Sequence, residues 1–506
     1  MSATRLFGVA ALLAASQLHA IPEGPEPGTA QWLAREAANY AKVLEADLEQ
    51  QLSPAFQLRW NIQSVANESA WLQRSLNDPS WLSPQTGNTQ LTPLCTSWAL
   101  PCTGDPFRYP GYDSFYEAEG EVSPFVVYDA QCARISGRVW APIDSAAGAM
   151  LPTVVIENGS VQAPETLYWW AAQALVRAGY VVLTFDPRGQ GRSDMQTPDG
   201  EQGGNFNSTV FWDGLVNLID FFRSSPSAPY PHNASCADTY PTEVTPFNPF
   251  WDRMDPQRLG LAGHSLGAAG VTRVQAYGAP GAEPWPGLLD ADNPVDVIVA
   301  WDKLGDISGE AGPVQPRVPA MGHTSEYGLA PVPHLSAPDP EAHKAAYRGW
   351  QDAEVPVFQL TIQGSAHYEW SLIPGFPATF WCPDPASGSC EGGWAQPMAE
   401  HYTVAWFDRW LKQPGEPGYA DADARLLDDA QWQERYSFYY RSARDFPDRS
   451  GQRQLCEDIR AGCAAPQQGR ADGLAESRGG GLGGGLLLFL LAAAFRPGRC
   501  SRSARS

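Results

Sequence analysis

The chain has 506 residues, of which 43% are hydrophobic and 18% are charged, so it can bury a sizeable core and is too long for one small domain. Its formal net charge of −22 argues against binding nucleic acid through the phosphates. We interpret this charge as a soluble acidic surface.

The first 20 residues predict a secretory signal. Arg5 supplies a positive start, residues 6–15 form a short apolar run, and residues 18–20 resemble a cleavage site. Residues 14–16 offer a second cleavage site. We therefore expect an exported protein that resides in the periplasm, at the cell surface or outside the cell.

Nine cysteines are present, and eight of them lie between the signal and the C-terminal tail. An even number in an exported protein indicates disulfides. Close spacing favours the pairs Cys95–Cys102, Cys382–Cys390 and Cys456–Cys463, which leaves Cys132 with Cys236, although sequence does not prove a connectivity. Zinc binding is the alternative, but the sequence contains no C-x-x-C or H-E-x-x-H motif.

Residues 21–122 predict a helical, disulfide-containing N-terminal extension. Ala, Leu, Glu and Gln recur at helical intervals over residues 28–83, and loops rich in Pro and Cys follow to about residue 112. This region carries no catalytic signature.

From about residue 123 the pattern alternates between strands and helices. Residues 124–128 and 134–140 predict an antiparallel pair, and a helix over 167–178 ends at Gly179. Further strands are expected at 153–156, 180–185, 258–262, 295–300, 317–321 and 357–362, and Val404, Phe407 and Leu411 mark a last core helix. This alternation predicts a mostly parallel sheet with helices on both faces.

Residues 263–267 read Gly-His-Ser-Leu-Gly, the G-x-S-x-G motif. A strand-like segment precedes the motif and a helix-like segment follows it, which is the context of a nucleophile elbow. Such a turn holds its serine in a strained backbone conformation with Oγ exposed above the sheet. Ser265 is therefore the predicted nucleophile.

Residues 185–194, Phe-Asp-Pro-Arg-Gly-Gln-Gly-Arg-Ser-Asp, look like the turn that follows the fourth strand in many α/β-hydrolases. With the elbow, they make residues 123–412 resemble the α/β-hydrolase superfamily, and secreted esterases and lipases in particular. The resemblance implies the α/β-hydrolase fold, with an insertion over about 195–257. Residues 413–463 would form a C-terminal extension.

The superfamily places its catalytic residues in the order nucleophile, acid, histidine. His367 follows the expected last strand and stands where the family has its general base. Glu326 follows the strand predicted at 317–321, the family's usual place for the acid, and Asp302, which follows the preceding strand, is the rival. The oxyanion hole would use the backbone N–H groups of Leu266 and Ser160.

The insertion could be a surface loop around a helix at 209–223 or part of a lid. Seven aromatic side chains are candidates for an apolar acyl pocket, with core packing as the alternative: Trp169, Trp170, Trp212, Phe250, Trp251, Tyr368 and Trp370.

These residues predict a secreted serine hydrolase that cleaves small-molecule or lipid esters through an acyl-enzyme on Ser265, without a metal or organic cofactor. The alternatives are a peptidase or acyltransferase on the same scaffold, and a catalytically inactive surface-binding protein. The intact serine, histidine and acid candidates argue against the last.

The C-terminal tail, residues 464–506, combines a glycine-rich run at 479–485, an apolar run at 486–495, and four arginines: Arg496, Arg499, Arg502 and Arg505. This order resembles the glycine-glycine sorting tails of Gram-negative bacteria, which implies a sorting protease and transient membrane contact. A disordered tail is the alternative.

Overall fold

The computed structural model describes residues 118–463, apart from 161–163, 192, 195, 205–206, 240–242, 306–313, 329–333 and 372–394, together with isolated positions at 29–31, 33, 34, 37 and 115. These residues belong to the first of two units into which the chain divides, Met1–Ala464. The expected signal, the tail, most of the N-terminal extension and the pairs Cys95–Cys102 and Cys382–Cys390 lie outside the described residues.

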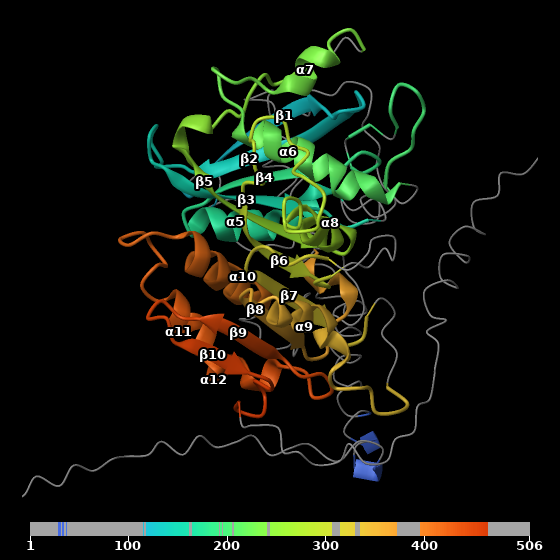
Figure 1. The fold of residues 1–506 in the computed structure, drawn as a ribbon, viewed down its shortest axis with the longest axis vertical. Helices are drawn as coiled ribbons and strands as arrows, with labels where there is room; N and C mark the ends of the chain where they lie inside the picture. The colour runs from blue at the N-terminus through green and yellow to red at the C-terminus, as the bar shows by residue number, and fades with distance from the viewer. Residues whose placement is uncertain are drawn as a thin grey trace, which may run out of the picture. The chain divides into compact units, whose positions relative to one another are not determined.

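The described part of the chain forms a ten-stranded sheet in the order β1-β2-β4-β3-β5-β6-β7-β8-β9-β10, which runs from top to bottom in Figure 1. The strands are β1 (Gly120–Tyr128), β2 (Arg134–Pro142), β3 (Leu151–Glu157), β4 (Val181–Asp186), β5 (Met254–His264), β6 (Val295–Trp301), β7 (Ala320–Ser325), β8 (Val357–Ile362), β9 (Ala443–Pro447) and β10 (Arg453–Cys456).

The sheet is parallel only in its centre, from β4 through β3, β5, β6 and β7 to β8. The neighbours β1, β2 and β4 pair antiparallel at one edge, and β8, β9 and β10 do so at the other. The expectation of a mostly parallel sheet therefore holds for the centre. Strands β9 and β10 come from residues 413–463, so this predicted extension completes the sheet.

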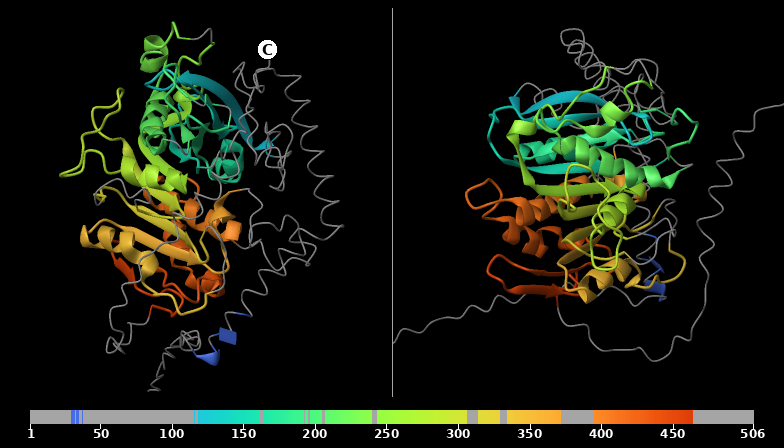
Figure 2. Two further views of the ribbon diagram at one scale, coloured as in Figure 1. Left: turned by 90° about the vertical axis from the view of Figure 1, so that its right-hand side faces the viewer. Right: turned by 45° about the horizontal axis from the view of Figure 1, so that its top comes forward.

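Helices cover both faces of the sheet, as the views in Figure 2 show. Val154 and Ile156 of β3 pack into one core cluster with α5 (Trp169–Arg177) and α10 (Ala395–Leu411). Val155 packs into the other cluster with α6 (Asp213–Arg223) and α8 (Leu266–Val274), while α9 (Ala345–Asp352) adds Tyr347 and Trp350 to it. Successive side chains of a strand point to opposite faces of the sheet, so this continuous apolar strand contributes side chains to both core clusters.

A glycine marks the end of helix α5, and a proline lies directly before strand β7. Gly179 has φ +84° just after α5, a left-handed conformation in which glycine carries no Cβ penalty, as the predicted helix end requires. Strand β7 begins at Ala320 instead of the expected Arg317. Pro319 has no N–H to donate to a ladder, and the Arg317 N–H bonds to the Gln275 side chain instead.

Part of the predicted insertion belongs to the core. Helix α6 lies within it, close to the predicted 209–223, and Leu215, Leu218 and Phe221 on this helix are fully buried against the sheet. Helix α6 therefore packs on the sheet as part of the core. No helix in the described ranges is long and apolar enough to cross a membrane.

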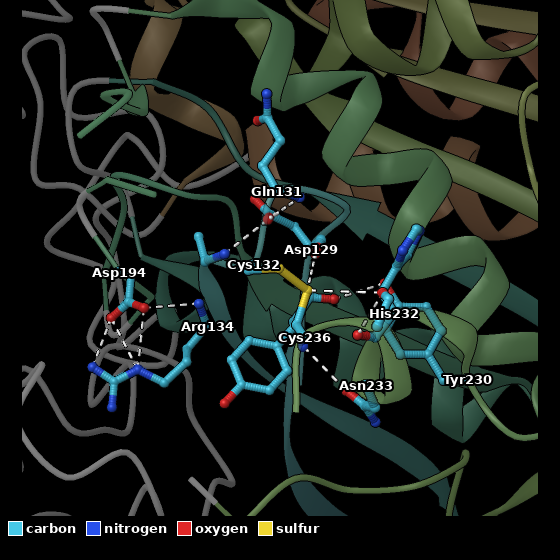
Figure 3. Close-up of a disulfide and its surroundings, with 12 residues drawn as sticks. Asp129, Gln131, Cys132, Arg134, Asp194, Tyr230, His232, Asn233 and Cys236 are labelled. Carbon is cyan, nitrogen blue, oxygen red and sulfur yellow. Dashed lines mark hydrogen bonds and ion pairs between the residues drawn. A yellow bond between two sulfur atoms is a disulfide. The ribbon is translucent and has the colours of Figure 1, made fainter. Parts of the chain in front are cut away.

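Two of the expected disulfides are formed, Cys132–Cys236 and Cys456–Cys463. Figure 3 shows the first, which ties the turn between β1 and β2 to the end of α7 (Pro231–Ser235). Such bonds form and persist in oxidising compartments, which agrees with an extracellular or otherwise oxidising location.

Candidate active site

Ser265 lies in a sharp turn between β5 and α8, as the motif predicts. Its backbone has φ +58° and ψ −120°, a conformation that costs energy for any residue with a Cβ. The Ser265 N–H donates to the Trp301 carbonyl on the neighbouring strand at 3.0 Å, which holds the turn against β6.

The two glycines of the motif are required by close backbone contacts. A Cβ on Gly263 would lie 2.3 Å from the Gly267 carbonyl oxygen, and one on Gly267 would lie 2.4 Å from the Asn158 carbonyl oxygen. Both approaches are shorter than any normal contact, so a side chain at either position would clash with the backbone.

His367 lies beside Ser265, although the two residues are 102 positions apart. His367 is the first residue of the short 3-10 helix His367–Trp370 after β8, and its backbone N–H donates to the Gly328 carbonyl at 3.0 Å. Nε2 of the imidazole lies 2.9 Å from Ser265 Oγ. This distance is within the range in which a general base can take the serine proton.

Asp302, and not Glu326, contacts the other side of His367. Oδ2 of Asp302 lies 2.6 Å from Nδ1 of the imidazole. The Asp302 carboxylate also accepts hydrogen bonds from the Ser325 N–H and Oγ, both at 2.8 Å. The structure thus corrects the expectation that Glu326 orients His367 and gives that contact to its rival.

The environment of Asp302 favours its charged form. Burial would raise the pKa of this carboxyl, but hydrogen bonds from His367 and Ser325, with the charge of His367, lower the pKa to about 2. Asp302 is therefore an ionised carboxylate at neutral pH. The two hydrogen bonds from Ser325 are a contribution that the sequence pattern did not reveal.

Glu326 is buried beside the loop that carries His367. Its carboxylate accepts from the Gly364 N–H and from Ser437 Oγ, both at 2.6 Å, and its own N–H donates to Ser365 Oγ at 3.2 Å. These hydrogen bonds therefore join the loop that carries His367 to the segment around Ser437, shortly before β9. Strand β7 ends at Ser325, later than the expected residue 321, so Glu326 follows it directly.

The turn expected to form the oxyanion hole lies against Ser265. A Cβ on Gly159 would lie 2.9 Å from Tyr168 Oη and 3.2 Å from Ser265 Cβ, so a larger residue would displace these neighbours. Ser160 follows it and is half-buried. Leu266 is the first residue of α8, where backbone N–H groups have no acceptor within the helix. The oxyanion roles of Ser160 and Leu266 stay predictions.

Most of the aromatic candidates for an acyl pocket are core residues. Trp169, Trp170 and Trp370 are fully buried in one cluster, and Trp212 and Phe250 are buried in the other. Trp251 is exposed by 43%. Among the seven candidates, half-buried Tyr368 is the one whose ring faces His367, with the ring centroids 5.7 Å apart.

Within the described ranges, no group of three or more His, Cys, Asp or Glu side chains is arranged to hold a metal ion.

No protein-family model and no curated protein matches this chain. One similar solved structure is a ferulic acid esterase from Streptomyces cinnamoneus, which is 14% identical with a TM-score of 0.33. The match covers 59% of this chain and 94% of the esterase chain. A likeness at this level identifies neither an activity nor a substrate.

Proposed function

We propose that the chain is a serine hydrolase of the α/β-hydrolase superfamily. The observation that carries the proposal is the hydrogen-bonded series Ser265 Oγ, His367 Nε2, His367 Nδ1 and Asp302 Oδ2, with distances of 2.9 and 2.6 Å. These residues follow β5, β8 and β6 at the carboxyl ends of parallel strands, and their chain order is nucleophile, acid, histidine.

Within this class, the proposed activity is hydrolysis of carboxylic esters. His367 takes the proton of Ser265 as Oγ attacks the ester carbonyl, and the tetrahedral intermediate forms. The carbonyl C–O bond to the alcohol then breaks, and His367 returns the proton to the leaving oxygen. Water, activated by the same imidazole, attacks the acyl-enzyme and releases the acid.

The proposed roles of the remaining residues follow from their positions. Asp302 holds the Nδ1–H of His367 and stabilises the imidazolium that forms during each transfer. The N–H groups of Leu266 and Ser160 would stabilise the developing oxyanion, with the helix N-terminus of α8 adding its partial positive charge. A small-molecule or lipid ester is the proposed substrate.

A peptidase or an acyltransferase would use the same three residues and differ only in the leaving group or the acceptor. The third alternative, an inactive surface-binding protein, is disfavoured by the intact contacts among Ser265, His367 and Asp302. The two disulfides support an exported enzyme, and the sorting role of the tail remains a proposal from its sequence.

A fluorophosphonate probe and a panel of esters would test the proposal. The wild-type protein should be labelled at Ser265 and should hydrolyse nitrophenyl esters of short or long acyl chains faster than matched amides. Ser265→Ala should abolish labelling and lower kcat by roughly 10⁴- to 10⁶-fold in a folded protein. Ester turnover near the wild-type rate in folded Ser265→Ala would refute the proposal.

A further inference from the structure

Three hydrogen bonds join the predicted oxyanion turn to the backbone of His367. The Gly159 N–H donates to Tyr168 Oη at 3.0 Å, Tyr168 Oη lies 2.8 Å from Nδ1 of His264, and Nε2 of His264 lies 2.7 Å from the His367 carbonyl oxygen. None of these contacts belongs to a regular helix or strand ladder. His264 is the motif residue directly before the nucleophile.

The chemistry of the groups fixes the position of each hydrogen in this series of three hydrogen bonds, which runs from Gly159 through Tyr168 and His264 to His367. The His367 carbonyl can only accept, so Nε2 of His264 must carry a hydrogen. In the neutral imidazole Nδ1 is then an acceptor, and Tyr168 must donate to it. The Tyr168 oxygen in turn accepts from Gly159. Each donor has one acceptor, and the direction of donation is the same along the whole series.

Burial keeps the series in this protonation state. Tyr168 is fully buried and His264 is 2% exposed. Burial, with a smaller contribution from the charge of His367, lowers the pKa of His264 to about 3. The imidazole of His264 is therefore neutral at any pH at which an esterase with a histidine base would work.

The series connects the parts that the proposed reaction must hold together. At one end is the turn 158–160, where Gly159 packs against Ser265 and precedes Ser160. At the other end is the residue that carries the base. The rings of His264 and His367 also lie face to face at a tilt, with centroids 4.7 Å apart.

We propose that Tyr168 and His264 are positioning residues that hold the oxyanion turn and His367 at a fixed separation on either side of Ser265. This inference rests on the proposed function. A shift of about 1 Å in either part would misplace the oxyanion donor or the base, which is enough to cost about 100-fold in rate. Neither residue needs to touch the substrate.

The test compares kcat per active site, with the active sites counted by fluorophosphonate titration. Tyr168→Phe removes one hydroxyl and should lower kcat about 10- to 100-fold, with KM changed by less than about threefold. His264→Leu should cost as much. His264→Gln has an amide that can accept from Tyr168 and donate to His367, and it should recover most of the loss.

Because the residues act in one series, the double variant Tyr168→Phe/His264→Leu should be no slower than the slower single variant. The matched control is Tyr180→Phe, which removes another fully buried hydroxyl, bonded to Asp408 at 2.6 Å. It should lower the melting temperature without changing kcat per active site. A wild-type kcat per active site in Tyr168→Phe would overturn the inference.

Failure of the proposed function would look different. In that case the wild-type protein would neither react with the fluorophosphonate nor turn over any ester. The series would then be tested by NMR of ¹⁵N-labelled histidine, in which His264 should be neutral with its hydrogen on Nε2 at pH 7. A charged ring, or a hydrogen on Nδ1, would overturn the inference whatever the activity.

Discussion

Nδ1 of His367 and Oδ2 of Asp302 lie 2.6 Å apart, although the two residues are separated by 65 positions in the chain. The contact is possible because Asp302 follows β6 and His367 follows β8, and these strands point the same way within one sheet. Ser325, at the end of the intervening β7, donates twice to the same carboxylate. The carboxyl end of each of these three strands therefore contributes to the orientation of one imidazole.

Asp302→Asn is expected to lower kcat far more than Glu326→Gln. Without the carboxylate the imidazole loses its orientation and the stabilisation of its charge, so kcat should fall by roughly 10³- to 10⁴-fold. Glu326→Gln should stay within about tenfold of the wild type, since it leaves the Asp302 contact intact. Steady-state ester hydrolysis measures both. A larger loss in the Glu326 variant would return the orienting role to that residue.

Glu326→Ala is expected to lower the free energy of unfolding, because the Glu326 carboxylate accepts two buried hydrogen bonds. The change leaves the Gly364 N–H and the Ser437 hydroxyl without this buried acceptor, which should cost about 2–4 kcal/mol in the free energy of unfolding. Urea unfolding measures the loss, with exposed Glu243→Ala as a control expected within about 0.5 kcal/mol of wild type. An equal effect of the two changes would show that the buried hydrogen bonds contribute little.

Removing the Cys132–Cys236 disulfide is expected to destabilise the protein more than removing Cys456–Cys463. The first bond joins residues 104 positions apart and the second joins residues 7 apart. Closure of the longer loop restricts the unfolded chain more, so the paired Cys→Ala changes should cost about 4–5 and about 2 kcal/mol, respectively. Denaturant unfolding under oxidising conditions measures both values. Similar losses would contradict this entropic account.

Glu157→Gln is expected to stabilise the protein increasingly as the pH rises. The Glu157 carboxyl is fully buried, neither of its oxygens has a hydrogen-bond partner in the described structure, and burial raises its pKa well above 4.5. Below about pH 4.5 the carboxyl is protonated in both states. Above it, the unfolded chain ionises while the folded protein retains the proton, so folded wild type loses stability at about 1.4 kcal/mol per pH unit until the folded pKa is reached.

Unfolding of wild type and Glu157→Gln at pH 5, 6 and 7 would measure this divergence. Exposed Glu243→Gln is the matched control and should show the same difference from wild type at every pH. A constant difference for Glu157→Gln as well would mean that the Glu157 carboxyl ionises normally in the folded protein, and would refute the prediction.

Local pattern determined much of this protein. The continuous apolar run Val154-Val155-Ile156 predicted a strand buried on both faces, and its side chains lie in the two core clusters. Gly263 and Gly267 fit a turn that no larger residue allows. The identities of Ser265 and His367 as the pair in contact could likewise be predicted, because each follows a strand with a clear signature. Close spacing of cysteines also predicted the pair Cys456–Cys463, and assigning the close pairs left Cys132 with Cys236, which are bonded as well.

The choice between Asp302 and Glu326 depended on tertiary structure. Both are acids that follow a parallel strand, so their local sequences do not show which one contacts the imidazole. The bounds of β7, Ala320–Ser325, were also not apparent from its apolar pattern. Which carboxylate reaches the imidazole depends on the register of β6, β7 and β8 and on competing partners. Ser437, from a segment 111 residues away, binds the Glu326 carboxylate.

The same reason explains why the sequence did not reveal the contacts of Tyr168 and His264 or the addition of β9 and β10 to the sheet. A hydrogen bond between residues 96 positions apart leaves no period or spacing in the chain. Strand β9 is recognisable only by its partner, because the short segment Ala443–Pro447 gains its stability from pairing with β8. Sequence determines which local structures the chain prefers, whereas packing decides which distant side chains meet.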